Sequence, residues 1–241
     1  LDFTINPETG LTNLGCRRMM LRGRREAGVD LNAPSDLRAI YEASVRRGET
    51  LPISFVLGAH PVDHVAATMR IPMDETNLLA SLRATPLNLV KSVSNEILVP
   101  SDAEMVIEGY LDERGYIEDE GPFGEFAGYY GVMKKNPVFH LTAITMRTDA
   151  LFQTSTISGP HIGCTDTAVL NTLKTEVVVW RALMTAVREP VAVNATSAGA
   201  GMFNLRISIR PRVPGEARNA IAAAFGCLGN VKNVFVVNDD I

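Results

Sequence analysis

The sequence predicts an α+β fold built on a β-barrel or a curved mixed sheet. Segments typical of strands dominate the middle of the chain, and helical patterns occur at intervals between them. The 241 residues are 46% hydrophobic, which is enough for one large domain or two small ones with a real core. We find no internal repeat, low-complexity tract or flexible linker in the sequence.

Five segments carry helical patterns. The first covers residues 35–47, where Ser35 is suited to be the N-cap and Gly48 to stop the helix. Pro61 suits the first turn of a short helix that runs to residue 68. The other predicted helices cover residues 74–83, 166–187 and 216–225.

Strand patterns fill most of the remaining sequence. Residues 1–32 predict strands joined by turns, and residues 51–58 predict a short buried strand. The acidic stretch 113–131 is expected to be a loop. Further strands are predicted at residues 88–94, 96–99, 104–112, 138–147, 150–156, 189–195, 202–210 and 233–238.

Composition argues against several classes of function. The formal net charge is -4, and basic residues cluster only within residues 17–25, so nucleic acid is a poor candidate partner. No apolar run approaches the length of a membrane span, and no signal peptide is recognisable. Cys16, Cys164 and Cys227 are far apart, which argues against a disulfide framework or a zinc ribbon and fits a reducing cytoplasm. We expect these cysteines to be small core residues rather than nucleophiles.

The loop at residues 120–125 reads Glu-Gly-Pro-Phe-Gly-Glu and is the strongest candidate for chemistry. Its tight turn can bring Glu120 and Glu125 into one pocket, where their pKa values would interact. Coupled carboxylates are common in proton transfer. The alternative is a solvated acidic hairpin, against which stand the aromatic residues Phe123, Phe126, Tyr129 and Tyr130.

Other candidate motifs are weaker. In a strand, Arg17 and Arg18 would point to opposite faces, so one could pair with a buried carboxylate; two surface arginines are the alternative. His60 and His64 are four residues apart, but Pro61 and the lack of a third nearby histidine favour structural or surface roles. The Gly-rich stretch 197–201 lacks the context of a phosphate-binding loop and is expected to be a turn.

Four segments in the right order resemble the UbiD family of prenylated-FMN-dependent reversible decarboxylases. They are the Glu-Gly-Pro-Phe-Gly-Glu-x-x-Gly-Tyr loop at 120–129, Thr-Asn-x-Gly-x-x-Arg at 12–18, the strand at 99–109 and the segment 236–241. In the last, Asn238 stands where the family has an aspartate. The similarity spans essentially the whole chain.

The resemblance implies a catalytic trio of Arg18, Glu120 and Glu125. Arg18 would pair with Glu120 and help to hold the substrate carboxylate, while Glu125 would donate the proton after carbon dioxide leaves. The implied reaction is the non-oxidative, reversible decarboxylation of an α,β-unsaturated or (hetero)aromatic carboxylic acid.

The resemblance also implies a cofactor site for prenylated FMN, with Mn2+ or Mg2+ and a nearby K+. The family's asparagine and glutamate metal ligands correspond to Asn13 and Glu75. Its histidine ligand falls at Asp36, which is a departure, although Asp is also a hard oxygen ligand. The implied cofactor-binding residues are Asn13, Leu14, Cys16, Arg18, Met69, Glu75 and Lys232.

By the same resemblance, residues 1–241 are expected to form the central cofactor-binding domain, a split β-barrel of the flavin-reductase-like type with flanking helices. The chain lacks an initial Met and stops at the end of a predicted strand, so we expect a fragment without the N- and C-terminal domains. The full-length protein is expected to be a homo-oligomer. Two alternatives stay open: a flavin-binding fragment without turnover, and a metal hydrolase that uses Glu75, Glu120 and Glu125.

Overall fold

The computed structural model describes residues 1–71 and 73–240, so Ile241 at the end of the last motif lies outside the described part. The chain divides into two compact units. The first unit comprises Leu1–Phe123 and Gly131–Thr154, and the second comprises Gly124–Tyr130 and Ser155–Ile241. Within residues 1–71 and 73–240, no helix has both the length and the apolar character needed to cross a membrane.

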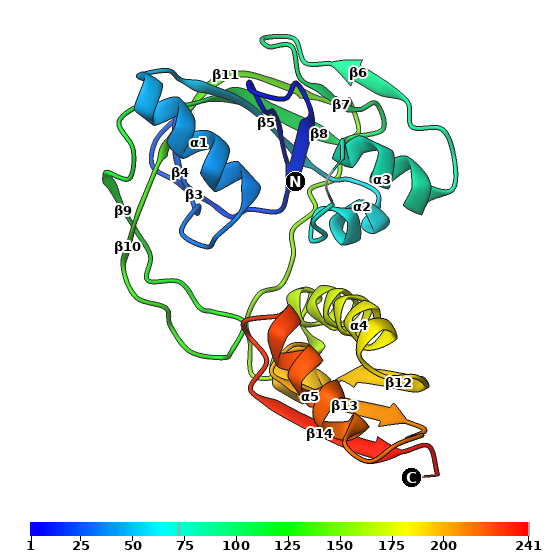
Figure 1. Ribbon diagram of the computed structural model, residues 1–241. Coiled ribbons are helices and arrows are strands. Elements are labelled where there is room, and N and C mark those ends of the chain that lie inside the picture. Colours follow the sequence, from blue (N-terminus) through cyan, green and yellow to red (C-terminus); the bar gives the residue numbers. More distant parts are fainter. Residues whose placement is uncertain (72, 241) are drawn as a thin grey trace. The chain divides into compact units, whose positions relative to one another are not determined.

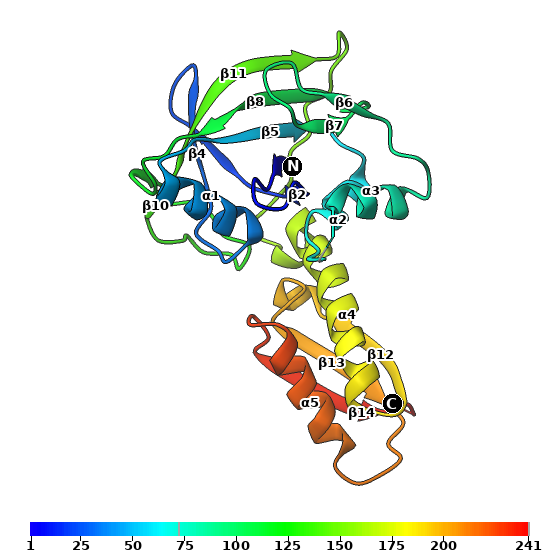
Figure 2. The same cartoon turned by 45° about the horizontal axis from the view of Figure 1, so that its top comes forward.

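A curled seven-stranded sheet, antiparallel throughout, forms the frame of the first unit (Figures 1 and 2). The strand order is β2-β1-β5-β8-β11-β4-β3. The strands are β1 (Asp2–Ile5), β2 (Thr12–Gly15), β3 (Met19–Leu21), β4 (Glu26–Val29), β5 (Leu51–Leu57), β8 (Met105–Leu111) and β11 (Val138–Met146).

Alternation along β5 builds a core on each face of this sheet. Leu51, Ile53 and Phe55 point to one face, where α1 (Asp36–Arg47) packs through its apolar side. Val56 points to the other face, toward α2 (Pro61–Ala66) and α3 (Glu75–Arg83). Two short hairpins complete the unit, β6 (Leu89–Lys91) with β7 (Leu98–Pro100) and β9 (Glu118–Glu120) with β10 (Lys134–Asn136).

The second unit is a three-stranded sheet covered on one face by two helices. Its elements are η1 (Ile162–Cys164), α4 (Asp166–Ala186), β12 (Pro190–Ala195), η2 (Ser197–Gly199), β13 (Asn204–Ile209), α5 (Glu216–Cys227) and β14 (Asn233–Asn238). The strand β13 pairs antiparallel with β12 and parallel with β14. Its inward residues Leu205, Ile207 and Ile209 pack against α4 and α5, which forms a purely apolar core.

Most predicted elements are present. The α+β class is confirmed, as are the Ser35 N-cap and the Gly48 stop of α1, where Gly48 has φ 68°. The strand predicted at 150–156 is wrong, because contacts through side chains replace a partner strand there. Leu151 N–H donates to the Glu104 carboxylate, and the Gln153 side chain bonds the backbone N–H and C=O of Ala59. The loop predicted at 113–131 contains β9, which pairs with β10.

The cysteines are also placed differently from the prediction. Cys16 and Cys164 are exposed rather than in the core, and Cys227 is half-buried. The stretch predicted to be a turn at 197–201 begins with the short helix η2, after which Ala200 and Gly201 have positive φ.

Candidate active site

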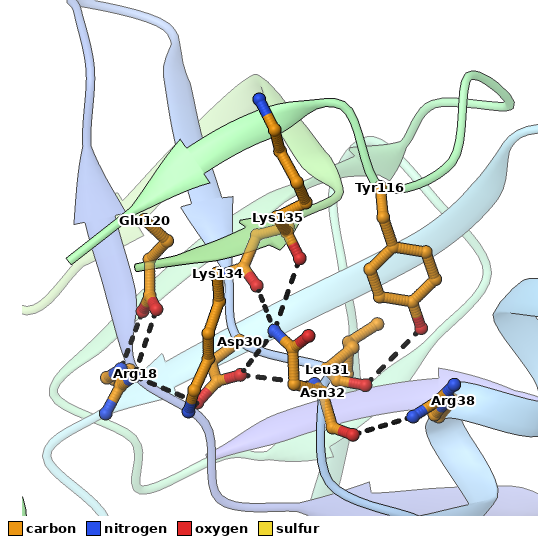
Figure 3. Close-up of polar contacts among 10 residues, drawn as sticks. Arg18, Asp30, Leu31, Asn32, Arg38, Tyr116, Glu120, Lys134 and Lys135 are labelled. Carbon is orange, nitrogen blue, oxygen red and sulfur yellow. Dashed lines mark hydrogen bonds and ion pairs between the residues drawn. The ribbon is translucent and has the colours of Figure 1, made fainter. Parts of the chain in front are cut away.

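Arg18 and Glu120 form a two-point ion pair in the first unit (Figure 3). Arg18 Nε donates to Glu120 Oε1 at 2.6 Å, and Arg18 Nη2 donates to Oε2 at 3.0 Å. The Glu120 side chain is 1% exposed and that of Arg18 17% exposed. The guanidinium also lies 4.8 Å from the centroid of the Phe123 ring. Such parallel, charge-assisted hydrogen bonds fix orientation as well as supplying energy.

The β9–β10 hairpin explains why Glu120 is buried and its neighbour is not. Side chains alternate along a strand, so Glu120 and Asp119 point to opposite sides. Asp119 is 63% exposed and pairs with Lys135 at 2.8 Å. The solvated-hairpin alternative therefore describes Asp119 and not Glu120. Lys134 lies directly opposite Glu120 in the strand register.

Asp30 was not recognised in the sequence and lies beside this pair. Its Oδ2 is 3.2 Å from Arg18 Nη2 and 3.8 Å from Lys134 Nζ. Burial alone would raise the pKa of Asp30, but hydrogen bonds from Asn32 and the charges of Arg18 and Lys134 lower it below its usual value. No local sequence pattern marks Asp30, because its position opposite Arg18 follows only from the register of the β3–β4 hairpin.

Asn13 and Glu75 are brought together by the start of α3. The edge strand β2 offers alternate N–H groups to this helix: Thr12 donates to Asp74 at 2.9 Å, and Leu14 donates to Glu75 in a short hydrogen bond. Asn13 Nδ2 donates to the same Glu75 oxygen at 3.1 Å. These contacts pin the carboxylate next to the asparagine side chain.

The Asn13–Glu75 pair places two oxygen-bearing side chains next to each other. Asn13 Oδ1 is buried and has no hydrogen-bond partner. Burial raises the pKa of Glu75 to about 7; the charges of Asp36 and Asp2 add to the rise, whereas the hydrogen bonds from Leu14 and Asn13 oppose it. Oxygen donors of this kind suit Mn2+ or Mg2+. Within residues 1–71 and 73–240, no three His, Cys, Asp or Glu side chains come together in a group that could hold a metal.

Glu125 and Lys232 belong to the second unit. The loop that carries Glu125 is closed by the Glu125 N–H bond to Tyr129 O at 2.8 Å. The adjacent Phe126 ring lies 5.8 Å from that of Phe203, and Lys232 Nζ lies 4.5 Å from the Phe203 ring centroid. Lys232 therefore packs on the same aromatic pair that flanks the Glu125 loop, which the sequence did not reveal.

The remaining predicted residues have mixed placements. Leu14 is buried and contributes its backbone N–H to Glu75, while Cys16 is exposed. Met69 follows α2 and its N–H bonds Ala66 O at 3.0 Å. His60 is the N-cap of α2, where its Nδ1 accepts from Val62 N–H at 3.2 Å. His64 Nε2 lies 3.2 Å from Gln153 Oε1. Both histidines therefore have structural contacts.

Two family models match the chain. The 3-octaprenyl-4-hydroxybenzoate carboxy-lyase Rift-related domain matches residues 2–161, and the C-terminal domain of the same carboxy-lyase matches residues 168–241. Together the two models cover most of the chain. The chain belongs to the UbiD family.

Curated relatives and solved structures agree with this family. Anhydromevalonate phosphate decarboxylases from Methanosarcina mazei and Methanothermobacter thermautotrophicus are 32% and 30% identical, each over 99% of this chain and 55% of their own length. The UbiD-class enzyme HmfF from Pelotomaculum thermopropionicum in complex with FMN is 33% identical with a TM-score of 0.91, over 100% of this chain and 53% of its own. An evolved dimeric form of HmfF in complex with prenylated FMN is 32% identical with a TM-score of 0.92, over 100% of this chain and 55% of its own. The chain thus spans about half the length of the curated relatives it matches.

Proposed function

We propose that this chain supplies the cofactor-binding and acid–base residues of a UbiD-type decarboxylase. The reaction would be the non-oxidative, reversible decarboxylation of an α,β-unsaturated or (hetero)aromatic carboxylic acid with prenylated FMN. The single observation that supports this most is the buried two-point pair of Arg18 with Glu120. The relatives are named for different acids, so the substrate is proposed only as a class.

In the proposed reaction, the side chains orient the acid and supply one proton. Arg18, held by Glu120, would present guanidinium N–H groups to the substrate carboxylate. The bond between the carboxylate carbon and its neighbour breaks, carbon dioxide leaves, and the electron pair stays on the neighbouring carbon. The Glu125 carboxyl would then donate its proton to that carbon and be reprotonated from solvent. Prenylated FMN, when bound, supplies the electron sink that side chains lack.

Residues outside the catalytic trio would hold the cofactor. Asn13 and Glu75 fit Mn2+ or Mg2+ because of the unpartnered Asn13 oxygen and the buried Glu75 carboxylate, and Asp36 would add a nearby negative charge. Such an ion would neutralise the FMN phosphate. Leu14, Cys16 and Met69 are proposed to contact the cofactor or its K+, and Lys232 the phosphate.

The test uses full-length protein co-produced with a source of prenylated FMN under anaerobic conditions. Wild-type protein is expected to retain the cofactor by mass spectrometry and to release carbon dioxide from at least one acid of the proposed class. Glu125→Gln should abolish release while retaining the cofactor. The matched control is Asp119→Asn, an exposed acid of the same loop region, which should turn over normally. Normal turnover by Glu125→Gln would remove the proposed role of Glu125.

The main alternative is flavin binding by this chain without turnover. It is favoured by the chain's span of about half the length of the curated relatives, because domains that close over a substrate usually complete such sites. The absorbance spectrum of the chain alone separates bound flavin from none, and an assay against full-length protein separates binding from catalysis. Activity with no flavin would instead support the metal hydrolase that uses Glu75, Glu120 and Glu125.

Three further expectations are part of the proposal. The curled sheet of the first unit is proposed to be the flavin-reductase-like split β-barrel of the family. The whole chain is proposed to be the central part of a longer protein that forms a homo-oligomer, which mass determination of the full-length protein in solution would test. A cytoplasmic location is proposed because the three cysteines are far apart in the sequence, which fits a reducing compartment.

A further inference from the structure

Arg18 and Asp30 occupy directly opposed positions on one hairpin. In the β3–β4 pair, Met19 lies opposite Val29 and Leu21 opposite Ala27, so the next pair outward is Arg18 with Asp30. The backbone continues this register, because Asp30 N–H donates to Arg18 O at 3.3 Å. Opposite charges at directly opposed positions attract each other across a strand pair. The hairpin itself therefore places Asp30 beside Arg18.

The two carboxylate oxygens of Asp30 have different partners (Figure 3). Oδ1 accepts from both the backbone N–H and the side-chain Nδ2 of Asn32, each at 3.1 Å. Asn32 Nδ2 also reaches Asn136 Oδ1 at 2.6 Å, so the turn after β4 is tied to β10. Oδ2 lies between two cations, 3.2 Å from Arg18 Nη2 and 3.8 Å from Lys134 Nζ. One oxygen fixes the turn and the other bridges the charges.

Lys134 is a potential competitor of Arg18 for Glu120. It lies directly opposite Glu120 in the β9–β10 register, where cross-strand partners come close. Its Nζ is nevertheless drawn to Asp30, and both Glu120 oxygens accept from Arg18. Each of the two carboxylates, Glu120 and Asp30, contacts a cation, and Asp30 lies between Arg18 and Lys134. A negative charge between two positive ones reduces the repulsion between them.

We propose that Asp30 is a positioning residue that keeps Lys134 away from Glu120 and thereby fixes the guanidinium of Arg18. This inference rests on the proposed function, in which Arg18 orients the substrate carboxylate. The lowered pKa of Asp30 keeps the bridging carboxylate ionised at neutral pH. Asp30 gives the guanidinium a charged contact from a second strand, in addition to the two-point pair with Glu120.

The informative variant is Asp30→Asn in the full-length, cofactor-loaded protein. Asn forms the same turn as Asp, because its Oδ1 still accepts from Asn32, while the bridging oxygen beside Arg18 and Lys134 is replaced by an uncharged NH2 group that cannot accept from them. We expect kcat to fall by about 10- to 100-fold, as for small misplacements of catalytic groups. KM should change less than kcat, and the melting temperature should fall modestly at neutral pH, because a carboxylate with a lowered pKa also stabilises the fold. The matched control is Asp119→Asn. It removes the exposed ion pair of Asp119 with Lys135, which lies next to the Glu120–Lys134 position in the β9–β10 register, and it should leave kcat unchanged.

Lys134, the proposed competitor for Glu120, can be replaced in the Asp30→Asn variant. If Asp30 acts by holding Lys134 away from Glu120, the double variant Asp30→Asn/Lys134→Met should recover activity relative to Asp30→Asn alone. A merely structural role of Asp30 predicts no such recovery. Wild-type kcat in Asp30→Asn, or no recovery in the double variant, overturns the inference.

A second readout needs neither cofactor nor turnover. The Arg18 Nε–H that donates to Glu120 can be followed by NMR, and its exchange with solvent should be at least several-fold faster in Asp30→Asn than in wild type. An unchanged exchange rate contradicts the positioning role. If wild-type full-length protein released no carbon dioxide from any acid, the proposed function would fail, and this measurement alone would decide the role of Asp30.

Discussion

The two compact units differ in how they bury charge. Among the described residues, the second unit buries a single carboxylate, Glu216, whereas the first buries the larger set of Asp2, Asp63, Glu75, Glu108, Asp112 and Glu120. Glu216 accepts from the backbone N–H groups of Arg188 and Arg212 at 3.2 and 2.6 Å. Asp63 and Glu120 of the first unit are instead held by arginine side chains, and neither carboxylate oxygen of Asp2 has a hydrogen-bond partner.

This difference separates structural acids from candidates for chemistry. A carboxylate held by backbone N–H groups is fixed by the fold, and Glu108, which accepts from Val93 and Ser94, is of this kind within the first unit. Glu120 depends on the Arg18 side chain, and Glu75 lies beside the unpartnered oxygen of Asn13. Desolvated groups with specific charge partners are typical of functional sites. Glu75 and Glu120 are the buried acids of the first unit that the resemblance also indicates, and their roles in chemistry stay predictions.

The largest effect on stability is expected from removing the partner of a buried acid. Arg83 Nε donates to the fully buried Asp63 at 2.8 Å, so Arg83→Ala should leave an uncompensated charge. The expected loss is about 3–5 kcal/mol in the free energy of unfolding of the first unit. Native-state hydrogen exchange of the β5 amides measures it.

The control for this variant comes from the second unit. Arg210→Ala removes an exposed arginine that pairs with Glu189 and Asp239, and should cost no more than about 1 kcal/mol. Equal losses in the two variants would show that burial does not distinguish the ion pairs of the two units.

The second unit should instead be sensitive to its apolar core. Leu205 on β13 is fully buried between α4 and α5, so Leu205→Ala is expected to cost about 2–5 kcal/mol. Trp180 on α4 is the chain's single tryptophan, and its fluorescence reports unfolding of this unit. Val191→Ala on the exposed side of β12 is the control and should change stability by less than about 0.5 kcal/mol. A loss at Leu205 as small as at Val191 would contradict the apolar-core account.

Local signals in the sequence located most elements of the fold. The Ser35 cap and the Gly48 stop define α1 because capping is decided by neighbouring residues. The prediction of a strand at 150–156 was wrong because strand pairing depends on a partner that the local pattern does not specify. In the structure, the side chain of Gln153 bonds the backbone of Ala59. The strand β10 was not predicted for the same reason, because its three residues pair with β9 on the other side of the acidic loop.

The candidate site was recognisable in part. The resemblance pointed to Arg18 and Glu120, which the structure pairs, and to Asn13 and Glu75, which it also brings together. Asp30 was missed because an aspartate after a strand carries no signal until the hairpin register is known. The roles of these residues in catalysis and metal binding stay predictions.

A smaller effect, of opposite sign, is expected at Asp2. Burial raises the pKa of Asp2, although the charge of Arg17 opposes the rise, so its ionised form destabilises the folded state at neutral pH. Asp2→Asn should therefore increase the free energy of unfolding by roughly 1–2 kcal/mol near pH 8. The gain should disappear near pH 3, roughly below the ordinary pKa of an aspartate, where both states are protonated. Urea unfolding at the two pH values tests this, and a loss of stability at pH 8 would contradict it.

The smallest effect on stability is expected from the loss of carboxylate charge in acid. In this respect the two units should behave alike. Burial alone would raise the pKa of Asp112, but hydrogen bonds from Arg114 and His140 lower it below the ordinary value. Backbone N–H groups, chiefly that of Arg212, lower the pKa of Glu216. A carboxyl whose pKa is lower in the folded state stabilises the protein above its unfolded pKa, and this contribution is lost as the pH falls through the folded pKa.

Asp112→Asn and Glu216→Gln are therefore expected to be less stable than wild type at pH 7, with the difference shrinking below about pH 4, the ordinary range of carboxyl pKa values. Melting temperatures measured between neutral and strongly acidic pH give the two curves. Glu108→Gln removes the backbone-held acid of the first unit and serves as a third curve. A difference that stayed constant with pH would mean that shape, and not the charge of the carboxylate, accounts for the loss. If the curve of Asp112→Asn converged on wild type and that of Glu216→Gln did not, side-chain donors and backbone donors would differ in how they hold a buried charge.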